Sequence, residues 1–166
     1  MKVGEYCNKC VVAIASSADA ADAAKLMRTH HVGFLVVHRE GDVLRKPVGV
    51  LTDRDLVLGV MARDVDPYAV TVEDIMSRQP LTANESDVLN DLLQGLRLAG
   101  FRRAPVVDAR GALVGIMTND DAIEVITGLM CDVAGSIKSE QRQERRRRTD
   151  PPPARSPLPR AGAAAV

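Results

Sequence analysis

Two threonine–aspartate pairs have the spacing needed to form a polar corner at the start of a helix. Thr52 precedes Asp55 by three residues, and Thr118 precedes Asp121 by the same interval. In each copy the pair follows a short apolar run, which is typical of a buried strand that enters a helix. We call these the first and second corners. Each would combine the N–H groups of a helix start with a hydroxyl and a carboxylate, and so could bind a polar ligand beside an apolar strand edge.

The chemistry of such a corner favours a ribose over a bare anion. A carboxylate repels a phosphate group beside it, whereas a pair of ribose hydroxyls is what an acidic residue binds in dinucleotide sites. A simpler interpretation is a capping box, in which threonine and aspartate accept each other's backbone N–H. The capping box explains less well why Gly49 and Gly115 stand three residues before each threonine, where a side chain would obstruct close approach of another group.

The corners belong to a longer internal repeat. The stretch from 48 to 57 is matched from 114 to 123, and a shift of 70 pairs Leu26 with Leu96. We therefore predict an α/β (α+β) fold of two tandem β-α-β-β-α repeats, with segments 1–70, 71–137 and 138–166. Neither repeat is large enough to cover its own apolar face, so we expect the two to pack on each other.

Apolar periodicity and turn residues predict the elements of each repeat. The first repeat is expected to contain strands at 11–14, 34–37 and 48–51 and helices at about 18–30 and 53–62. The second is expected to contain a helical turn at 71–76, strands at 80–82, 104–107 and 113–117, and helices at 87–99 and 119–126. A further helix is predicted from 129 to about 148, followed by a Pro-rich disordered tail.

Composition argues against several classes of partner. The chain has two Tyr, two Phe and no Trp, whereas single-stranded nucleic acid is bound by stacking on aromatic side chains. Residues 1–137 carry a net charge of −5 and residues 138–166 carry +5, so only the C-terminal segment is basic. No apolar run approaches the ~18 residues of a membrane span, and no secretory leader is evident. We expect a cytoplasmic protein with no membrane or nucleic-acid partner.

The other reactive residues do not form a catalytic or metal site. Cys7 and Cys10 have the spacing of a metal knuckle, but a metal site needs four ligands and no second pair follows. All three histidines lie in the first repeat, away from Asp121. No nucleophile motif or pair of buried acids accompanies them. We therefore predict a binding module without catalytic residues, bound metal or required cofactor, rather than an enzyme.

The two repeats, the Gly-x-x-Thr-x-x-Asp motifs and the stretch from Arg102 to Asp108 together resemble a tandem pair of cystathionine-β-synthase (CBS) domains, also called a Bateman module, over about residues 1–137. The resemblance implies clefts that bind AMP, ADP, ATP, S-adenosylmethionine or NAD. It implies that the aspartates bind ribose and that the threonines and two arginines bind phosphate. The implied nucleotide-binding residues are Gly49, Thr52, Asp55, Arg102, Arg103, Gly115, Thr118 and Asp121.

The two repeats differ where a phosphate would bind. Val32 and Gly33 occupy the first-repeat places of Arg102 and Arg103. We therefore expect a charged nucleotide in the cleft that contains the second corner.

The resemblance also implies a regulatory role. We expect a homodimer of two pairs in a flat disc that senses an adenosyl ligand and signals to a partner protein, which the sequence does not identify. The alternative is a ligand-free structural or interaction module that acts through dimerisation and its basic C-terminal segment. In that case the threonine–aspartate pairs only cap helices.

Overall fold

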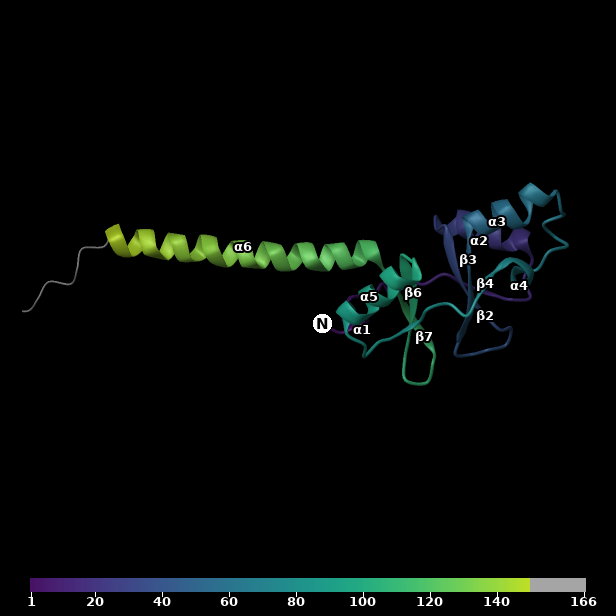
Figure 1. The fold of residues 1–166 in the computed structure, drawn as a ribbon, viewed down its shortest axis with the longest axis horizontal. Coiled ribbons are helices and arrows are strands. Elements are labelled where there is room, and N and C mark those ends of the chain that lie inside the picture. The colour runs from purple at the N-terminus through teal and green to yellow at the C-terminus, as the bar shows by residue number, and fades with distance from the viewer. Residues whose placement is uncertain (150–166) are drawn as a thin grey trace, which may run out of the picture. The chain divides into compact units, whose positions relative to one another are not determined.

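The computed structural model describes residues 1–149 of the chain, and it divides into two compact units, the first from Met1 to Ile126 and the second beginning at Thr127. The first unit contains two small sheets with helices packed beside them (Figure 1), which confirms the predicted α/β class. The elements are α1 (Val3–Tyr6), β1 (Ala13–Ala15), α2 (Ala20–His30), β2 (Phe34–His38), β3 (Pro47–Thr52), α3 (Asp53–Gly59), the 3₁₀ turn η1 (Met61–Arg63), α4 (Val72–Ile75), β4 (Ser77–Arg78), β5 (Ala83–Asn84), α5 (Leu89–Ala99), β6 (Arg103–Val107), β7 (Leu113–Thr118) and α6 (Asn119–Thr149).

Three strands of the first sheet have the same topology as the three strands of the second, which confirms the predicted duplication. In the first, β1 lies parallel to β2, which is antiparallel to β3, and this register places Phe34 opposite Thr52. In the second, β5 lies parallel to β6, which is antiparallel to β7, and Arg103 lies opposite Thr118. Each corner therefore begins where the third strand of its repeat ends.

The first sheet is completed by residues that follow the first copy in the sequence. The Val72 N–H donates to the Ala18 carbonyl at 2.8 Å, and the Glu73 N–H donates to the Ser16 carbonyl at 3.0 Å. Strand β4 then pairs with β3 at the sheet edge. Val72 is fully buried in the same core cluster as residues of α2, β2 and β3.

The N-terminal segment completes the second sheet in the same way. The Gly4 N–H donates to the Glu85 carbonyl at 2.9 Å, and Asn8 and Ile116 exchange two backbone hydrogen bonds of 2.9 and 2.8 Å. Val3 and Cys7 are buried in the core cluster of the second sheet. The boundary at 70/71 thus separates the two sequence copies but not the two packed halves, because each half takes a short helix and an edge segment from the chain that precedes the other copy.

The helices begin and end close to the predicted positions, with two differences. Helix α2 was predicted from about residue 18 but begins at Ala20, because Asp19 caps it through Oδ1, which accepts from the Asp22 N–H at 2.7 Å. Helix α5 ends at Gly100, which has a φ of +71° as expected of a glycine stop. Helix α6 runs without a break from Asn119 to Thr149, whereas two separate helices were predicted.

Two sequence predictions concern other parts of the chain. The predicted Pro-rich tail lies outside the described residues. In the part of the chain that the structure describes, no helix is long and apolar enough to cross a membrane.

Candidate functional site

Both corners form the capping box that the simpler interpretation predicts. Asp55 Oδ2 accepts from the Thr52 N–H and from its hydroxyl, both at 2.8 Å, and Thr52 Oγ1 accepts from the Asp55 N–H at 3.2 Å. The corresponding distances between Thr118 and Asp121 are 2.8, 2.7 and 3.1 Å. The two corners are therefore nearly identical in their internal geometry.

A third capping box shows that this geometry alone does not identify a ligand site. Asp74 Oδ2 accepts from the Thr71 hydroxyl at 2.6 Å and from the Thr71 N–H at 2.9 Å at the start of α4. These two hydrogen bonds, the one from the hydroxyl foremost, lower the pKa of Asp74. Neither residue lines the cavity described next. The surroundings of a corner must decide whether it binds a ligand.

The first corner lines a cavity of about 340 Å³, which we call the corner cavity. Residues from both repeats form its walls, because the loop after α5 and the start of β6 face the end of β3 and the start of α3. Its volume lies within the range of about 300–1,000 Å³ that is usual for small-molecule sites. Its lining consists of Gly33, Phe34, Val50, Thr52, Asp53, Arg54, Asp55, Ser77, Arg78, Gln79, Pro80, Leu81, Gly100, Phe101, Arg102, Arg103 and Pro105.

The two arginines that the resemblance assigns to phosphate binding line this cavity. Arg102 and Arg103 line it together with Thr52 and Asp55, and the Arg103 guanidinium lies 5.0 Å from the centre of the Phe34 ring, in a cation–π contact. This arrangement differs from the expected association of both arginines with the second corner. Arg103 neighbours that corner only through the β6–β7 backbone register, whereas its side chain reaches Phe34 of the first repeat.

The second corner does not share these surroundings. Thr118 and Asp121 are half-buried and do not line the corner cavity. Four of the eight sequence-predicted residues therefore meet at one place, namely Thr52, Asp55, Arg102 and Arg103.

The two motif glycines have a role in packing. A Cβ at Gly49 would overlap the Met76 sulfur and lie 3.0 Å from the Ser77 carbonyl oxygen. A Cβ at Gly115 would lie 2.6 Å from Cys7 Sγ and 3.0 Å from the Asn8 carbonyl oxygen. The group whose close approach these glycines permit is thus the edge segment supplied by the preceding chain. Neither glycine lines the corner cavity.

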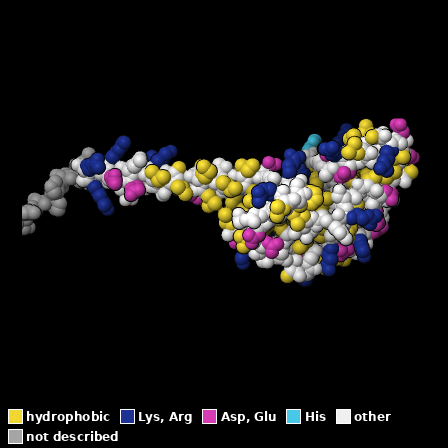
Figure 2. Space-filling view, in the orientation of Figure 1, with side chains coloured by type: hydrophobic (Ala, Val, Ile, Leu, Met, Phe, Trp, Pro, Cys, Tyr) yellow, Lys and Arg dark blue, Asp and Glu magenta, His cyan; other side chains and the backbone are white. Residues whose placement is uncertain are grey.

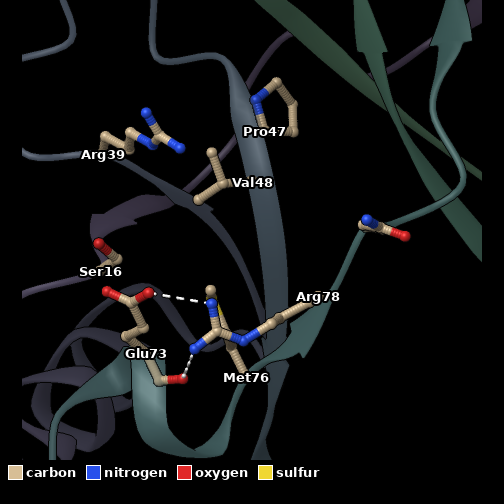
Figure 3. Close-up of a pocket in the computed structure, with 8 residues that line it drawn as sticks. Ser16, Arg39, Pro47, Val48, Glu73, Met76 and Arg78 are labelled. Carbon is tan, nitrogen blue, oxygen red and sulfur yellow. Dashed lines mark hydrogen bonds and ion pairs between the residues drawn. The ribbon is translucent and has the colours of Figure 1, made fainter.

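A second cavity, of about 370 Å³, also has Arg78 in its lining (Figure 3). There the Arg78 guanidinium donates to the Glu73 carboxylate at 3.0 Å and to the Glu73 carbonyl oxygen at 3.2 Å. Arg39 and Ser16 also line this cavity. Arg78 and Gln79 line both cavities, so the β4 segment and the residue after it contribute to both.

Several lining residues of the corner cavity were not predicted from the sequence. Arg78 lies on β4 and reaches the site only because this strand pairs with β3. Phe34 and Phe101 carried one available signal, since they are the two phenylalanines of a chain that is poor in aromatic residues. Asp53 and Arg54 lie inside the motif itself.

The cysteines and metal-binding side chains are dispersed. Cys7 is buried against Gly115, whereas Cys10 and Cys131 are exposed. Within residues 1–149, no group of three His, Cys, Asp or Glu side chains is placed to hold a metal ion.

Comparison with known proteins agrees with this architecture. The CBS domain model matches residues 3–62 and 72–128. An uncharacterized protein of Methanopyrus kandleri is 32% identical over 143 residues, which cover 86% of this chain and 71% of that protein.

Two solved structures resemble this one and contain adenosine compounds. The CBS domain pair of protein MJ0100, in complex with 5′-methylthioadenosine and S-adenosyl-L-methionine, has a TM-score of 0.66 and 26% identity, covering 77% of this chain and 97% of that one. CBSX2 in complex with AMP has a TM-score of 0.64 and 28% identity, covering 78% of this chain and 98% of that one. With two matched repeats, two sheets that share a three-stranded topology and neighbours that are themselves CBS pairs, this chain belongs to the CBS domain family as a tandem pair.

Proposed function

We propose that the corner cavity binds an adenine nucleotide and that the CBS pair acts as a regulatory module which reports the occupancy of this cavity to a partner protein. The observation that carries the proposal is the meeting of Thr52 and Asp55 with Arg102 and Arg103 in one cavity. The carboxylate suits the ribose end of a nucleotide, and the hydroxyl and the guanidinium groups suit its phosphates. The cavity therefore offers both kinds of contact across its width.

Asp55 is the residue to which we assign the ribose. Its Oδ2 is held by the two hydrogen bonds from Thr52, which fix the carboxylate in place, while its Oδ1 takes no part in the cap. A carboxylate fixed in this way is already oriented for ribose hydroxyls before the ligand arrives. The capping box and the binding role are thus compatible in one side chain.

The charge of the cavity favours a ligand that carries phosphate. Four arginines line it, Arg54, Arg78, Arg102 and Arg103, against the two carboxylates of Asp53 and Asp55. The excess of positive charge attracts AMP, ADP, ATP or NAD and disfavours S-adenosylmethionine, whose sulfonium is a cation. We therefore rank the phosphate-bearing adenine compounds above the adenosyl sulfonium.

The relatives support the class of ligand. The two similar CBS structures are complexes with S-adenosyl-L-methionine and 5′-methylthioadenosine in one case and with AMP in the other, and these compounds share an adenosine group. We assign the second corner, Thr118 and Asp121, to a weaker adenosine site, because it shares the ribose geometry but not the arginine-lined cavity.

A thermal-shift panel tests the proposal. The full chain is heated with AMP, ADP, ATP, NAD or S-adenosylmethionine, each at several concentrations. A ligand at 100 times its dissociation constant stabilises the folded form by about 2.7 kcal/mol, so we expect a clear rise of Tm with at least one phosphate-bearing compound. If none of the five compounds changes Tm at millimolar concentration, the proposal fails.

The same panel decides the alternative of a ligand-free interaction module. The observation that favours this alternative is the capping box at α4, where a threonine–aspartate pair caps a helix away from the corner cavity. If all three boxes only cap helices, removing each should lower stability to a similar extent and nucleotides should have no effect.

A further inference from the structure

Ser16 is a buried residue whose hydroxyl has no hydrogen-bond partner among the described residues. Of the side chains that the structure describes, it is the one polar side chain that is buried, with 8% of the residue exposed. Its backbone N–H donates to the His38 carbonyl at 2.8 Å, and its carbonyl oxygen accepts from the Glu73 N–H at 3.0 Å. Within residues 1–149 its hydroxyl makes no hydrogen bond. Buried hydroxyls are normally hydrogen-bonded, so this one is available to a ligand.

The Ser16 hydroxyl opens into the second cavity. No fully enclosed side-chain oxygen or nitrogen of the described residues lacks a hydrogen-bond partner, so the Ser16 oxygen must reach open space. Ser16 lines the second cavity, whose volume of about 370 Å³ is usual for small-molecule sites. In the view of Figure 3, its side chain lies between those of Arg39 and Glu73, which line the same cavity. The hydroxyl therefore indicates a ligand site.

Arg39 brings to this cavity a positive charge that no ion pair within residues 1–149 neutralises. The lining contains two arginines and one glutamate, so its net charge is +1. Arg78 donates to the Glu73 carboxylate at 3.0 Å, so these two charges compensate each other. The Arg39 guanidinium and the Ser16 hydroxyl can both donate to one acceptor. Together they favour an anionic group over a neutral one.

The backbone positions these polar groups at one end of the first sheet. Ser16 follows β1 and Arg39 follows β2, and because these strands are parallel, both residues leave the sheet at the same end. The Ser16 N–H donates to the carbonyl of the residue before Arg39, and the N–H of Glu73 on α4 donates to the Ser16 carbonyl. Backbone positions that are fixed before a ligand arrives reduce the entropy lost on binding.

An apolar surface lies beside the polar groups. Pro47 and Val48 at the start of β3 and Met76 at the end of α4 line the same cavity, and Figure 3 shows Val48 among the polar side chains. Contact with these three side chains would remove the apolar part of a ligand from water. The cavity thus combines donors for an anion with an apolar wall for a short hydrocarbon chain.

We propose that the second cavity binds a small carboxylate that carries a short apolar chain. The carboxylate accepts charge-assisted hydrogen bonds from the Arg39 guanidinium and the Ser16 hydroxyl, and the chain lies against Val48. One negative charge matches the one guanidinium that has no ion-pair partner among the described residues. A doubly charged phosphate fits less well, because the carboxylate of Glu73 repels it.

The charge of the folded repeats favours a small ligand over a polyanion. Residues 1–137 carry a net charge of −5. On the face that Figure 2 shows, the basic and acidic side chains of the first unit are interspersed rather than gathered in one basic track. A nucleic acid is held by several cations that follow its backbone, whereas a small carboxylate needs only the contacts of one cavity.

Glu73 determines whether the ligand also carries an amino group. Its Oε1 accepts from Arg78, while its Oε2 takes no part in that pair. An α-amino acid would place its ammonium on this second oxygen, whereas a simple acid would leave it to water. The carboxylate and the apolar chain are common to both sources. Valine and isovalerate differ only in the amino group, so these two compounds serve as the probes.

Saturation-transfer NMR with the full chain tests the site at constant ionic strength. We expect saturable binding of valine, of isovalerate or of both. We expect no binding of isobutylamine, which carries an ammonium in place of the carboxylate of isovalerate. If neither acid binds at concentrations up to about 20 mM, or if the amine binds as well as the acids, the proposal is overturned.

Two variants place the carboxylate. Arg39→Gln should weaken binding of the acid on the order of 10-fold, and Ser16→Ala about 5-fold, because each removes a hydrogen bond to a charged group. Arg45→Gln is the matched control, since Arg45 is exposed in the same connection between β2 and β3 but does not line the cavity. Equal losses for Arg39→Gln and Arg45→Gln would show unspecific charge attraction and overturn the site.

The stability of Ser16→Ala checks the observation on which the site depends. The hydroxyl has no partner within residues 1–149, and the substitution keeps both backbone hydrogen bonds of Ser16, so the Tm of the ligand-free protein should not fall. A clear decrease would show that the hydroxyl has a structural role and would count against the site.

Glu73→Gln separates the two probes. It removes the repulsion of a carboxylate and the acceptor of an ammonium, so isovalerate should bind more tightly and valine less tightly relative to it. An affinity for isovalerate that falls instead overturns the placement beside Glu73. Asp55→Ala, which we expect to weaken nucleotide binding, should leave isovalerate binding unchanged, because Asp55 does not line the second cavity. The two cavities can therefore be tested independently.

Discussion

The first and second corners have the same chemistry at different places in the molecule. Their threonine–aspartate hydrogen bonds agree to within 0.1 Å, yet only the first lines the arginine-rich corner cavity. The difference arises from what the other repeat presents. Arg102 and Arg103 of the second repeat face the first corner, whereas the first repeat has Val32 and Gly33 at the matching positions. In this tandem pair of repeats, the side chains that one repeat presents to the corner of the other determine what that corner can bind.

The largest expected effect separates the two aspartates. Asp55→Ala should cost roughly 1.5 to 3 kcal/mol of nucleotide binding, as loss of hydrogen bonds to a charged group does, while Asp121→Ala should change binding at the arginine-rich cavity little. Titration calorimetry with the best nucleotide of the panel measures both. Asp121→Ala is a matched control, because it removes the same capping bonds. Equal losses in the two variants would contradict the difference between the corners.

Substitution of the motif glycine by alanine should destabilise the fold to a similar extent in both repeats. Gly49→Ala and Gly115→Ala each bring a Cβ into the edge segment, at 3.0 Å from a carbonyl oxygen, and should lower the free energy of unfolding by about 1 to 3 kcal/mol. Gly95→Ala in α5 is the control, since its Cβ would meet only Leu81 at 3.8 Å. That change should stabilise the helix by up to about 1 kcal/mol. Urea unfolding of the three variants gives the comparison.

Making the second repeat resemble the first should weaken phosphate recognition. The double change Arg102→Val, Arg103→Gly gives the second repeat the residues of the first, and we expect about a 10-fold loss of affinity for ATP with little change for adenosine. The ATP affinity of the wild type should also fall with added salt more steeply than that of the variant. Equal losses for ATP and adenosine would instead indicate damage to the cavity.

The helix caps should contribute similarly in both repeats. Thr52→Ala and Thr118→Ala each remove a threonine cap of the same geometry, at a cost of about 1 kcal/mol. Thermal unfolding without ligand should show similar decreases of Tm for the two variants. A much larger decrease for one of them would reveal an interaction beyond the cap.

The smallest effect concerns Asp74, whose pKa is lowered by the hydrogen bonds from Thr71. A carboxylate with a depressed folded-state pKa stabilises the fold above its unfolded value, near 3.8, and this contribution is lost as the pH falls through the lower folded-state pKa. Asp74→Asn should therefore lower the free energy of unfolding slightly at neutral pH. Below about pH 4 the free energy of unfolding of this variant should depend less on pH than that of the wild type. Denaturant unfolding at pH 7, 4 and 3 tests the sign.

Local patterns predicted much of the fold. Apolar runs ending in Thr52 and Thr118 placed two strand–helix junctions correctly, because strand and cap signals there lie within a few residues. Gly100 predicted the end of α5 for the same reason. The break predicted after Ile126 was wrong, because Gly128 lowers helix propensity without preventing a helix.

The surroundings of the site could not be predicted in this way. The position of Arg103 over Phe34 depends on how two repeats face each other, and the sequence periodicity within one repeat carries no such information. The exchange of edge segments was missed for a related reason. The segment from 71 to 78 precedes the second copy in the chain, and only tertiary contacts show that it packs with the first.

Because each packed half takes an edge segment that precedes the other copy, the repeat in the sequence is not the same set of residues as the half that packs around one core. A fragment cut at residue 70 would lack Val72 and β4, and the remaining fragment would lack Val3 and Cys7, so each would expose an open sheet edge and a gap in its interior. During synthesis, the N-terminal residues must remain available until β7 has left the ribosome. The two halves should therefore unfold together in one cooperative transition, although the sequence repeats.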